Sequence, residues 1–236
     1  MGFMLQWGCA LIAFSPSCVF FMFRNRPQLY IISLAAAFAW LISMLGTGLF
    51  WSLVHISGEN VWPLTIIVGV LMQEAARFAF IYCFRRTEVI IKNSVNYTYE
   101  MLPLNDLSTS LAAGIGFGTM HSLMMAGSLI AATGGEGTLF VDSCPNIPLV
   151  LTVSLTALGF TILDVIFMIL GFVAERKRSN HLIAVIVVLH IAAGLSTLAN
   201  THGYGCIASM LLVLAVVIIS TVLLVWLSPM FLRVHR

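Results

Sequence analysis

The sequence predicts an all-α, polytopic membrane protein: one bundle of seven transmembrane helices over residues 1–236, with a lumenal or extracellular N-terminus and a cytosolic C-terminus. The prediction rests on the composition, on seven long apolar runs and on the placement of the basic residues. Sixty per cent of the residues are hydrophobic, 8% are charged, and the mean hydropathy is +1.04. Soluble domains average about 25% charged residues. The composition therefore excludes a soluble globular domain, a disordered chain and a nucleic-acid-binding domain.

Seven apolar runs are each long enough to cross a bilayer, which takes about 20 apolar residues in a helix. They cover residues 2–23, 29–54, 63–84, 107–132, 146–173, 181–200 and 205–227. The runs are continuous rather than alternating, which favours helices over the strands of a membrane barrel. The first run is too long for the core of a signal peptide and lacks a basic start, so we expect a retained span.

The basic residues outside these runs predict the orientation of the bundle. All ten follow the first, third, fifth or seventh run: Arg24, Arg26, Arg85, Arg86, Lys92, Arg176, Lys177, Arg178, Arg233 and Arg236. The N-terminus and the segments 55–62, 133–145 and 201–204 contain no Lys or Arg. Because basic loops stay in the cytosol, this asymmetry places the C-terminus there.

Two spans carry features that affect helix packing. Pro16 lies within the first span and should bend it, because proline removes a backbone donor. In the fourth span, small residues recur every four positions and form one stripe: Gly114, Gly118, Ser122 and Ala126. Such stripes let helix backbones approach closely in lipid. We expect this span to be central and tightly packed, with Gly116 widening the same groove.

Five ionisable residues lie inside the spans, where a charged side chain normally faces the bundle interior. They are Glu74 and Arg77 in the third span, His121 in the fourth, Asp164 in the fifth and His190 in the sixth. Glu74 and Arg77 are three residues apart and can pair on one helix face. The histidines could be neutral and bonded across helices, and Asp164 needs a histidine or a water. Glu, Asp and two His could also hold a metal or move a proton. We expect neither a metal nor another cofactor.

The five cysteines show no paired metal-binding spacing. Cys9, Cys18 and Cys83 lie within spans, where a small apolar role is expected. Cys144 and Cys206 lie at the outer ends of spans, in the oxidising compartment, so a disulfide between them is plausible.

Several short motifs resemble a known family in sequence order. They are Gly8-Cys9 with Ile12–Pro16, Ala36–Ser43, Gln73–Phe78, Gly114–Gly118, and His190 before Ala193-Gly194-Leu195. Together they resemble the anterior-pharynx-defective family, the seven-span scaffold subunit of γ-secretase. One departure is Asp164, at the position that best fits a histidine of that family.

The resemblance implies a non-catalytic scaffold within the membranes of the secretory pathway (endoplasmic reticulum, Golgi and plasma membrane). The partners it implies are a presenilin-like aspartyl protease, a nicastrin-like subunit and a presenilin-enhancer-like small subunit, together with membrane lipid but no nucleic acid.

The strongest rival interpretation is an intramembrane glutamate-dependent endopeptidase. Glu74, Arg77, Phe117, His121 and His190 are similar to motifs of the prenyl-protein (CAAX) endopeptidases. In those enzymes a glutamate activates water and histidines support the oxyanion. Three departures count against activity: Gln73 replaces the first glutamate, the arginine is one residue closer, and Gly194 replaces an asparagine. A third interpretation is a channel, transporter or receptor-like protein, although no internal repeat supports a transporter.

Overall fold

The structure, a computed structural model, describes residues 2–23, 25–55, 62–94, 106–132 and 139–233. Helices form almost all of this part of the chain. Their bounds are α1 (Gly2–Phe14), η1 (Ser15–Phe23), α2 (Pro27–His55), α3 (Trp62–Ser94), α4 (Asp106–Ser122), η2 (Leu123–Gly127), α5 (Ser128–Ala132), α6 (Leu149–Lys177), α7 (Asn180–Ser196), η3 (Thr197–Thr201) and α8 (Gly205–Arg233).

Within the described residues, seven helical stretches are long and apolar enough to cross a membrane. They are Met4–Phe23, Pro27–Val54, Trp62–Ile91, Asp106–Ala131, Leu149–Lys177, Asn180–Thr201 and Gly205–Leu227. The predicted all-α, seven-span class is confirmed. The orientation in the membrane stays a prediction, and two of the basic residues behind it, Arg24 and Arg236, lie outside the described residues.

Several helix boundaries differ from the predicted ones. Helix α3 continues about three turns past residue 84, because a helix does not have to end where its apolar run ends. Helix α6 begins at Leu149 because Pro148 before it has an extended backbone, with φ −55° and ψ 133°. It ends after Lys177, where Arg178 adopts the left-handed conformation and its N–H bonds back to the carbonyls of the last turn.

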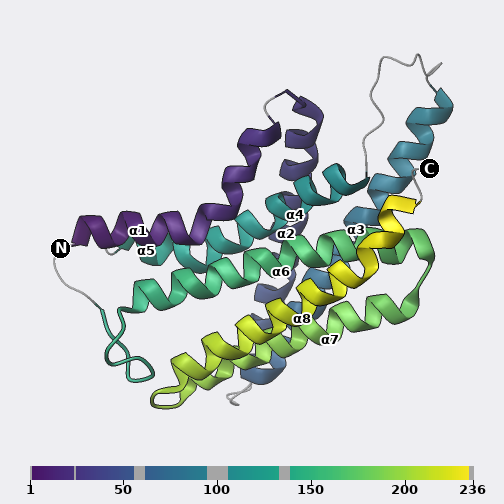
Figure 1. The fold of residues 1–236 in the computed structure, drawn as a ribbon. Coiled ribbons are helices and arrows are strands. Elements are labelled where there is room, and N and C mark those ends of the chain that lie inside the picture. The colour runs from purple at the N-terminus through teal and green to yellow at the C-terminus, as the bar shows by residue number, and fades with distance from the viewer. Residues whose placement is uncertain (1, 24, 56–61, 95–105, 133–138, 234–236) are drawn as a thin grey trace.

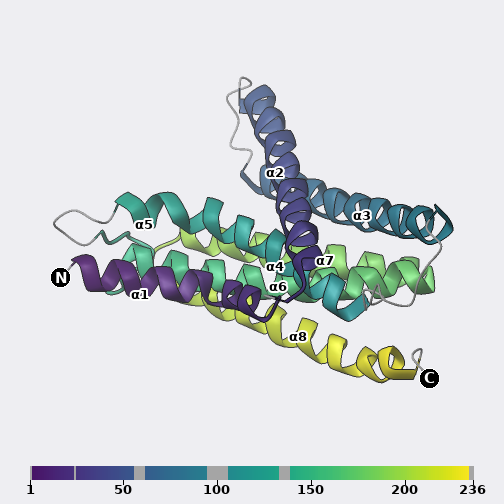
Figure 2. The ribbon, with the colours of Figure 1, turned by 90° about the horizontal axis from the view of Figure 1, so that it is seen from above.

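Helices α4, α6, α7 and α8 extend along the length of the molecule, and α2 crosses them at a wide angle (Figures 1 and 2). Helix α6 is at the centre: 78% of its most apolar stretch is buried, against 56% for the α4 span and at most 33% for the others. The expectation of a central fourth span is therefore confirmed, with α6 more enclosed still.

The first span changes direction near Pro16. The α-helix ends at Phe14, and a 3₁₀ helix continues from Ser15 to Phe23. Figure 1 shows η1 running away from the line of α1. The bend predicted at Pro16 is confirmed, and its cause is the backbone donor that proline lacks.

The buried apolar residues form three clusters around α6. One joins α6 to α7 and α8 through residues such as Phe167, Ile186 and Val213. A second joins α6 and α4 to α2. A third packs α1 and Ala126 against the start of α6. Since lipid is as apolar as these side chains, dispersion contacts and polar bonds have to hold the helices together.

Candidate helix-packing seam and buried ion network

The small residues of α4 lie directly against α6. A Cβ atom added to Gly114 would lie 2.8 Å from the Val165 Cα atom, and one added to Gly118 would lie 3.1 Å from the Thr161 Cα atom. Only glycine permits this separation, because the atoms opposite belong to the backbone of α6. We call this α4–α6 contact, centred on Gly114 and Gly118, the glycine seam.

The seam continues as polar and apolar contacts along α4. The Ser122 hydroxyl lies 2.5 Å from the Thr161 hydroxyl and 3.2 Å from the carbonyl oxygens of Ala13 and Ala157. It therefore joins α1, α4 and α6. Ala126, the last residue of the stripe, is fully buried between α1 and α6.

Gly116 does not belong to this seam, and the expectation that it widens the same groove is wrong. Two residues correspond to about 200° around a helix, so Gly116 faces away from α6. A Cβ atom at Gly116 would overlap the Ser33 carbonyl of α2. The Ser33 hydroxyl also donates to the Ala112 carbonyl at 2.7 Å. Helix α4 therefore presents one small face to α6 and another to the crossing helix α2.

The five ionisable residues of the spans form one connected network, which we call the ion network. Arg77 is at its centre and is fully buried. Its guanidinium donates to Asp164 Oδ1 at 2.6 Å and to the Asp164 carbonyl at 3.3 Å, and it lies 3.3 Å from Glu74 Oε1. The intrahelical pair between Glu74 and Arg77 is present, but the closest counter-charge of Arg77 is Asp164.

Each carboxylate of the network also bonds to one histidine. His121 Nδ1 lies 2.8 Å from Asp164 Oδ2, and His190 Nδ1 lies 2.6 Å from Glu74 Oε1. The histidine predicted for Asp164 is therefore His121, and the water alternative is not needed. Four helices meet in this network: α3, α4, α6 and α7.

Aromatic rings surround the network and shield it from lipid. The Arg77 guanidinium carbon lies 4.7 Å from the centre of the Phe117 ring and 5.5 Å from that of Phe167. The Trp40 ring of α2 lies 5.1 Å from the His121 ring. These distances allow cation–π attraction to Arg77 in a low-dielectric setting. The network thus has both polar bonds and a packed aromatic shell.

Within the described residues, no group of three or more His, Cys, Asp or Glu side chains is close enough to hold a metal ion. Each histidine instead faces its own carboxylate, and Arg77 lies between the two pairs. This arrangement suits a network of ion pairs better than a metal centre, because a guanidinium repels a cation.

A second charged cluster, which was not predicted from the sequence, lies at the end of the bundle that carries the α6–α7 turn. Arg85 donates to both carboxylate oxygens of Asp106 at 2.9 Å, and it lies 3.1 Å from Glu88 and 3.3 Å from Glu175. Arg176 also pairs with Asp106. In the sequence, Arg85 and Arg176 indicate only the orientation of the bundle. The available signal was Asp106, an acid at the first position of an otherwise apolar span, where a helix N-terminus favours negative charge.

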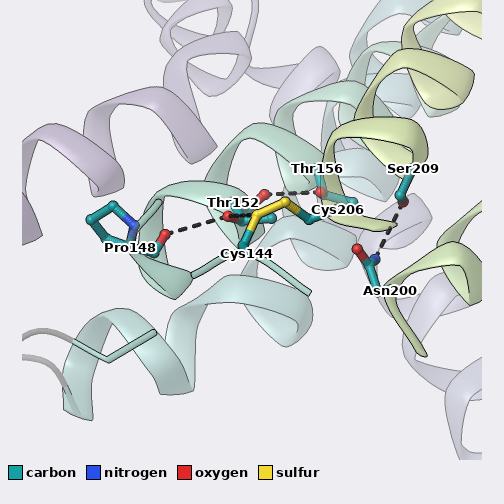
Figure 3. The surroundings of a disulfide bond; sticks show 7 residues. All are labelled: Cys144, Pro148, Thr152, Thr156, Asn200, Cys206 and Ser209. Atoms are coloured by element: carbon teal, nitrogen blue, oxygen red, sulfur yellow. Dashed lines mark hydrogen bonds between the residues drawn. A yellow bond between two sulfur atoms is a disulfide. The ribbon is translucent and has the colours of Figure 1, made fainter. Parts of the chain in front are cut away.

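The opposite end of the bundle is closed by a disulfide between Cys144 and Cys206, with Cα atoms 5.6 Å apart (Figure 3). The bond joins the segment before α6 to the start of α8. Backbone bonds accompany it, from Cys206 N–H to the Ser143 carbonyl and from Tyr204 N–H to the Asp142 carbonyl. Of the other cysteines, Cys9 is buried, whereas Cys18 and Cys83 are exposed.

A family model described as Aph-1 protein matches residues 4–228, nearly the whole chain. The chain belongs to the Aph-1 family. The relative from Arabidopsis thaliana, "Gamma-secretase subunit APH1-like", is 29% identical over 207 residues, which cover 85% of this chain and 83% of the relative. "Gamma-secretase subunit Aph-1" of Drosophila melanogaster is 28% identical over 200 residues, covering 83% and 81% of the two chains. "Gamma-secretase subunit Aph-1b" of Danio rerio is 25% identical over 221 residues, covering 89% and 84%.

The family predicted from the motifs is thereby confirmed. With seven helices suited to a bilayer and Aph-1 relatives of similar length, this chain is an integral membrane protein. Both the glycine seam and the ion network lie within the part of the chain that the family model matches.

Proposed function

We propose that this chain is a non-catalytic scaffold and assembly subunit of a γ-secretase-type intramembrane protease complex. It stabilises a presenilin-like aspartyl protease and a nicastrin-like subunit, with a presenilin-enhancer-like small subunit as a further partner. The match of the Aph-1 family model to residues 4–228 is the observation that carries this proposal. The relatives named as γ-secretase subunits support it.

The internal contacts are consistent with a scaffold. Helix α6 contributes to all three buried clusters, and the glycine seam fixes α4 against it through backbone contacts. A rigid centre of this kind holds the outer helices in fixed positions, where partner helices can bind against them. Large apolar side chains along α8, including Leu211, Ile218 and Val222, point outward and are available for lipid or for partner helices.

The ion network argues against a peptidase of its own. A water-activating glutamate has to reach both a water and the scissile carbonyl. Glu74 is 2% exposed, and its Oε1 atom is held by His190 and Arg77. His121, which the peptidase interpretation assigns to oxyanion support, is engaged with Asp164 instead. We therefore place catalysis in a partner subunit.

Membrane location and orientation complete the proposal. The chain resides in the membranes of the secretory pathway, from the endoplasmic reticulum through the Golgi to the plasma membrane. Its N-terminus and the Cys144–Cys206 disulfide face the lumen or exterior, and its C-terminus faces the cytosol. This orientation places the disulfide in an oxidising compartment.

The deciding experiment is purification of the tagged full-length chain in mild detergent, followed by mass spectrometry of the co-purifying chains. We expect presenilin-like and nicastrin-like proteins in near-equal amounts, and no proteolysis by the chain purified alone. Cleavage of a prenylated or transmembrane peptide by the isolated chain, with activity lost in a folded Glu74→Gln variant, would contradict the proposal.

A further inference from the structure

Three consecutive basic residues form the end of helix α6 and the turn to α7. Arg176 and Lys177 are in the last turn of the helix, and Arg178 follows it. All three are exposed. Helix α6 has 29 residues, which corresponds to about 44 Å and matches the thickness of a bilayer with its headgroups. Because the apolar stretches on both sides of the turn are suited to span the membrane, the turn lies in the headgroup layer.

Arg178 has a backbone conformation that favours glycine, with φ 49° and ψ 42°. Its N–H donates to the Glu175 carbonyl at 3.1 Å, and the Ser179 N–H donates to the Ala174 carbonyl at 2.9 Å. These two bonds form a Schellman motif, in which the left-handed position is usually glycine and sometimes asparagine. An arginine strains the backbone at this position. The termination of α6 therefore does not explain why the residue is an arginine.

Contacts within the chain do not explain the arginine either. In the part of the chain that the structure describes, the Arg178 side chain forms no hydrogen bond or ion pair. The acids described at this end of the bundle all contact Arg85: Glu88, Asp106 and Glu175. Arg176 pairs with Asp106 as well. The Arg178 guanidinium is thus an exposed positive charge whose counter-charge has to come from outside the described chain.

The two ends of the bundle differ in charge, and only this end attracts anions. The segments 139–145 and 201–204, at the end of the disulfide, contain no Lys or Arg. The α6–α7 turn lies at the same end of the molecule as the ends of α3 and α8 (Figures 1 and 2), and both of these helices carry further basic residues there, Arg86, Lys92 and Arg233. An anionic phospholipid brings phosphate and carboxylate oxygens to the same depth, and arginine binds both groups through its planar fork.

We propose that Arg176, Lys177 and Arg178 form a binding site for the headgroup of an anionic phospholipid, and that Arg178 is the residue on which the site depends most. A lipid fits better than an acidic segment of a partner protein, because the turn lies in the headgroup layer whatever else the chain binds. Anionic lipids are enriched in the cytosolic leaflet, the side on which the charge pattern places this turn. The site belongs to the chain itself and does not depend on the scaffold role.

The experiment titrates the full chain in detergent with phosphatidylserine or phosphatidylcholine and counts the bound lipid by native mass spectrometry. The wild type should prefer phosphatidylserine, and Arg178→Gly should weaken that binding about fivefold, the contribution of one basic residue at a membrane surface. Arg178→Lys keeps the charge and should keep the affinity. Arg26→Gly is the matched control, because Arg26 is also exposed but precedes α2, away from the α6–α7 turn (Figures 1 and 2). In lipid-free detergent, Arg178→Gly should raise the Tm by about 2–4 °C, since glycine relieves the strained backbone.

Four results would overturn the proposal. One is a wild-type protein that binds the two lipids equally, and another is an equal loss of phosphatidylserine binding in Arg178→Gly and Arg26→Gly. The third is displacement of the lipid by inorganic phosphate or by an acidic peptide at the same concentration, which would show that the turn takes any anion. The fourth is a lower Tm for Arg178→Gly in lipid-free detergent, because the arginine would then serve the fold.

Discussion

A single methyl group at Gly118 should force α4 and α6 apart. A Cβ atom at this position would lie 2.9 Å from Thr161 Cγ2, 3.0 Å from its carbonyl oxygen and 3.1 Å from its Cα atom. Ordinary contacts of this kind begin at 3.4 Å. Because two of the three atoms are backbone, rotation of a side chain cannot relieve the overlap. The helices have to separate by a few tenths of an ångström in Gly118→Ala.

The expected cost follows from two opposing terms. Overpacking a close contact typically costs about 1–3 kcal/mol, whereas replacing glycine by alanine inside a helix contributes up to about 1 kcal/mol of stability. Gly48 in α2 provides a matched control, because a Cβ atom there meets nothing within 4 Å. Gly48→Ala keeps the favourable term without the overlap. Gly118→Ala should therefore be about 1–3 kcal/mol less stable than Gly48→Ala.

The assay is thermal unfolding of both purified variants in the same detergent. For a chain of this size, 1 kcal/mol corresponds to about 2–4 °C in Tm. The Gly118→Ala midpoint should thus lie roughly 2–12 °C below that of Gly48→Ala. Equal midpoints for the two variants would refute the reasoning, because they would show that the α4–α6 separation is not limited by the glycine.

Three further predictions concern the ion network, the disulfide and the orientation. Arg77→Met leaves two buried carboxylates without their cation and should lower the free energy of unfolding by about 3–5 kcal/mol. Glu74→Gln leaves Arg77 paired with Asp164 and should lower it by about 1.5–3 kcal/mol. Equal shifts of the denaturation midpoint for the two variants would contradict this ranking. Removing the Cys144–Cys206 disulfide by Cys144→Ser should lower the Tm, since closing a 62-residue separation is worth up to about 4 kcal/mol. Non-reducing peptide mapping should find the two cysteines linked, and two free thiols would reject the bond. A C-terminal tag should be digested by protease added to sealed microsomes, and its protection would reverse the predicted orientation.

The spans were predictable because a bilayer imposes one strong constraint along the chain. Every spanning helix needs an apolar run of similar length, and this is visible in the sequence without any knowledge of contacts. The same reasoning gathers Glu74, His121, Asp164 and His190 into one layer, because their depth follows from their place in each span.

The pairing within that layer was not predictable, because it depends on how each helix is rotated and tilted about its axis. From the sequence, Asp164 could have faced either histidine. In the structure, its carboxylate is hydrogen-bonded to His121 and Arg77. Gly116 shows the same limit. Helix geometry places it on the face of α4 opposite the seam, but the identity of the helix that meets this face, α2 at a wide crossing angle, leaves no pattern in the sequence. The cluster around Arg85 was not predictable because Arg85 follows the predicted end of the third span, where a long side chain can turn toward solvent or toward partners.

The glycine seam and the ion network should be energetically coupled, because they share the same two helices. Helices α4 and α6 run antiparallel, so His121 and Asp164 lie three residues to either side of the Gly118–Thr161 contact, and their side chains bond across its level. Asp164 has a short side chain, so its 2.8 Å contact with His121 depends on the close approach that Gly118 allows. Separating the helices with Gly118→Ala should lengthen that contact. Asp164→Asn should then cost less in the Gly118→Ala background than in the wild type, with a coupling energy of about 0.5–3 kcal/mol in a double-mutant cycle. Strictly additive losses would mean that α4 adjusts locally around Gly118 and that the acid–base pair is held by Arg77 alone.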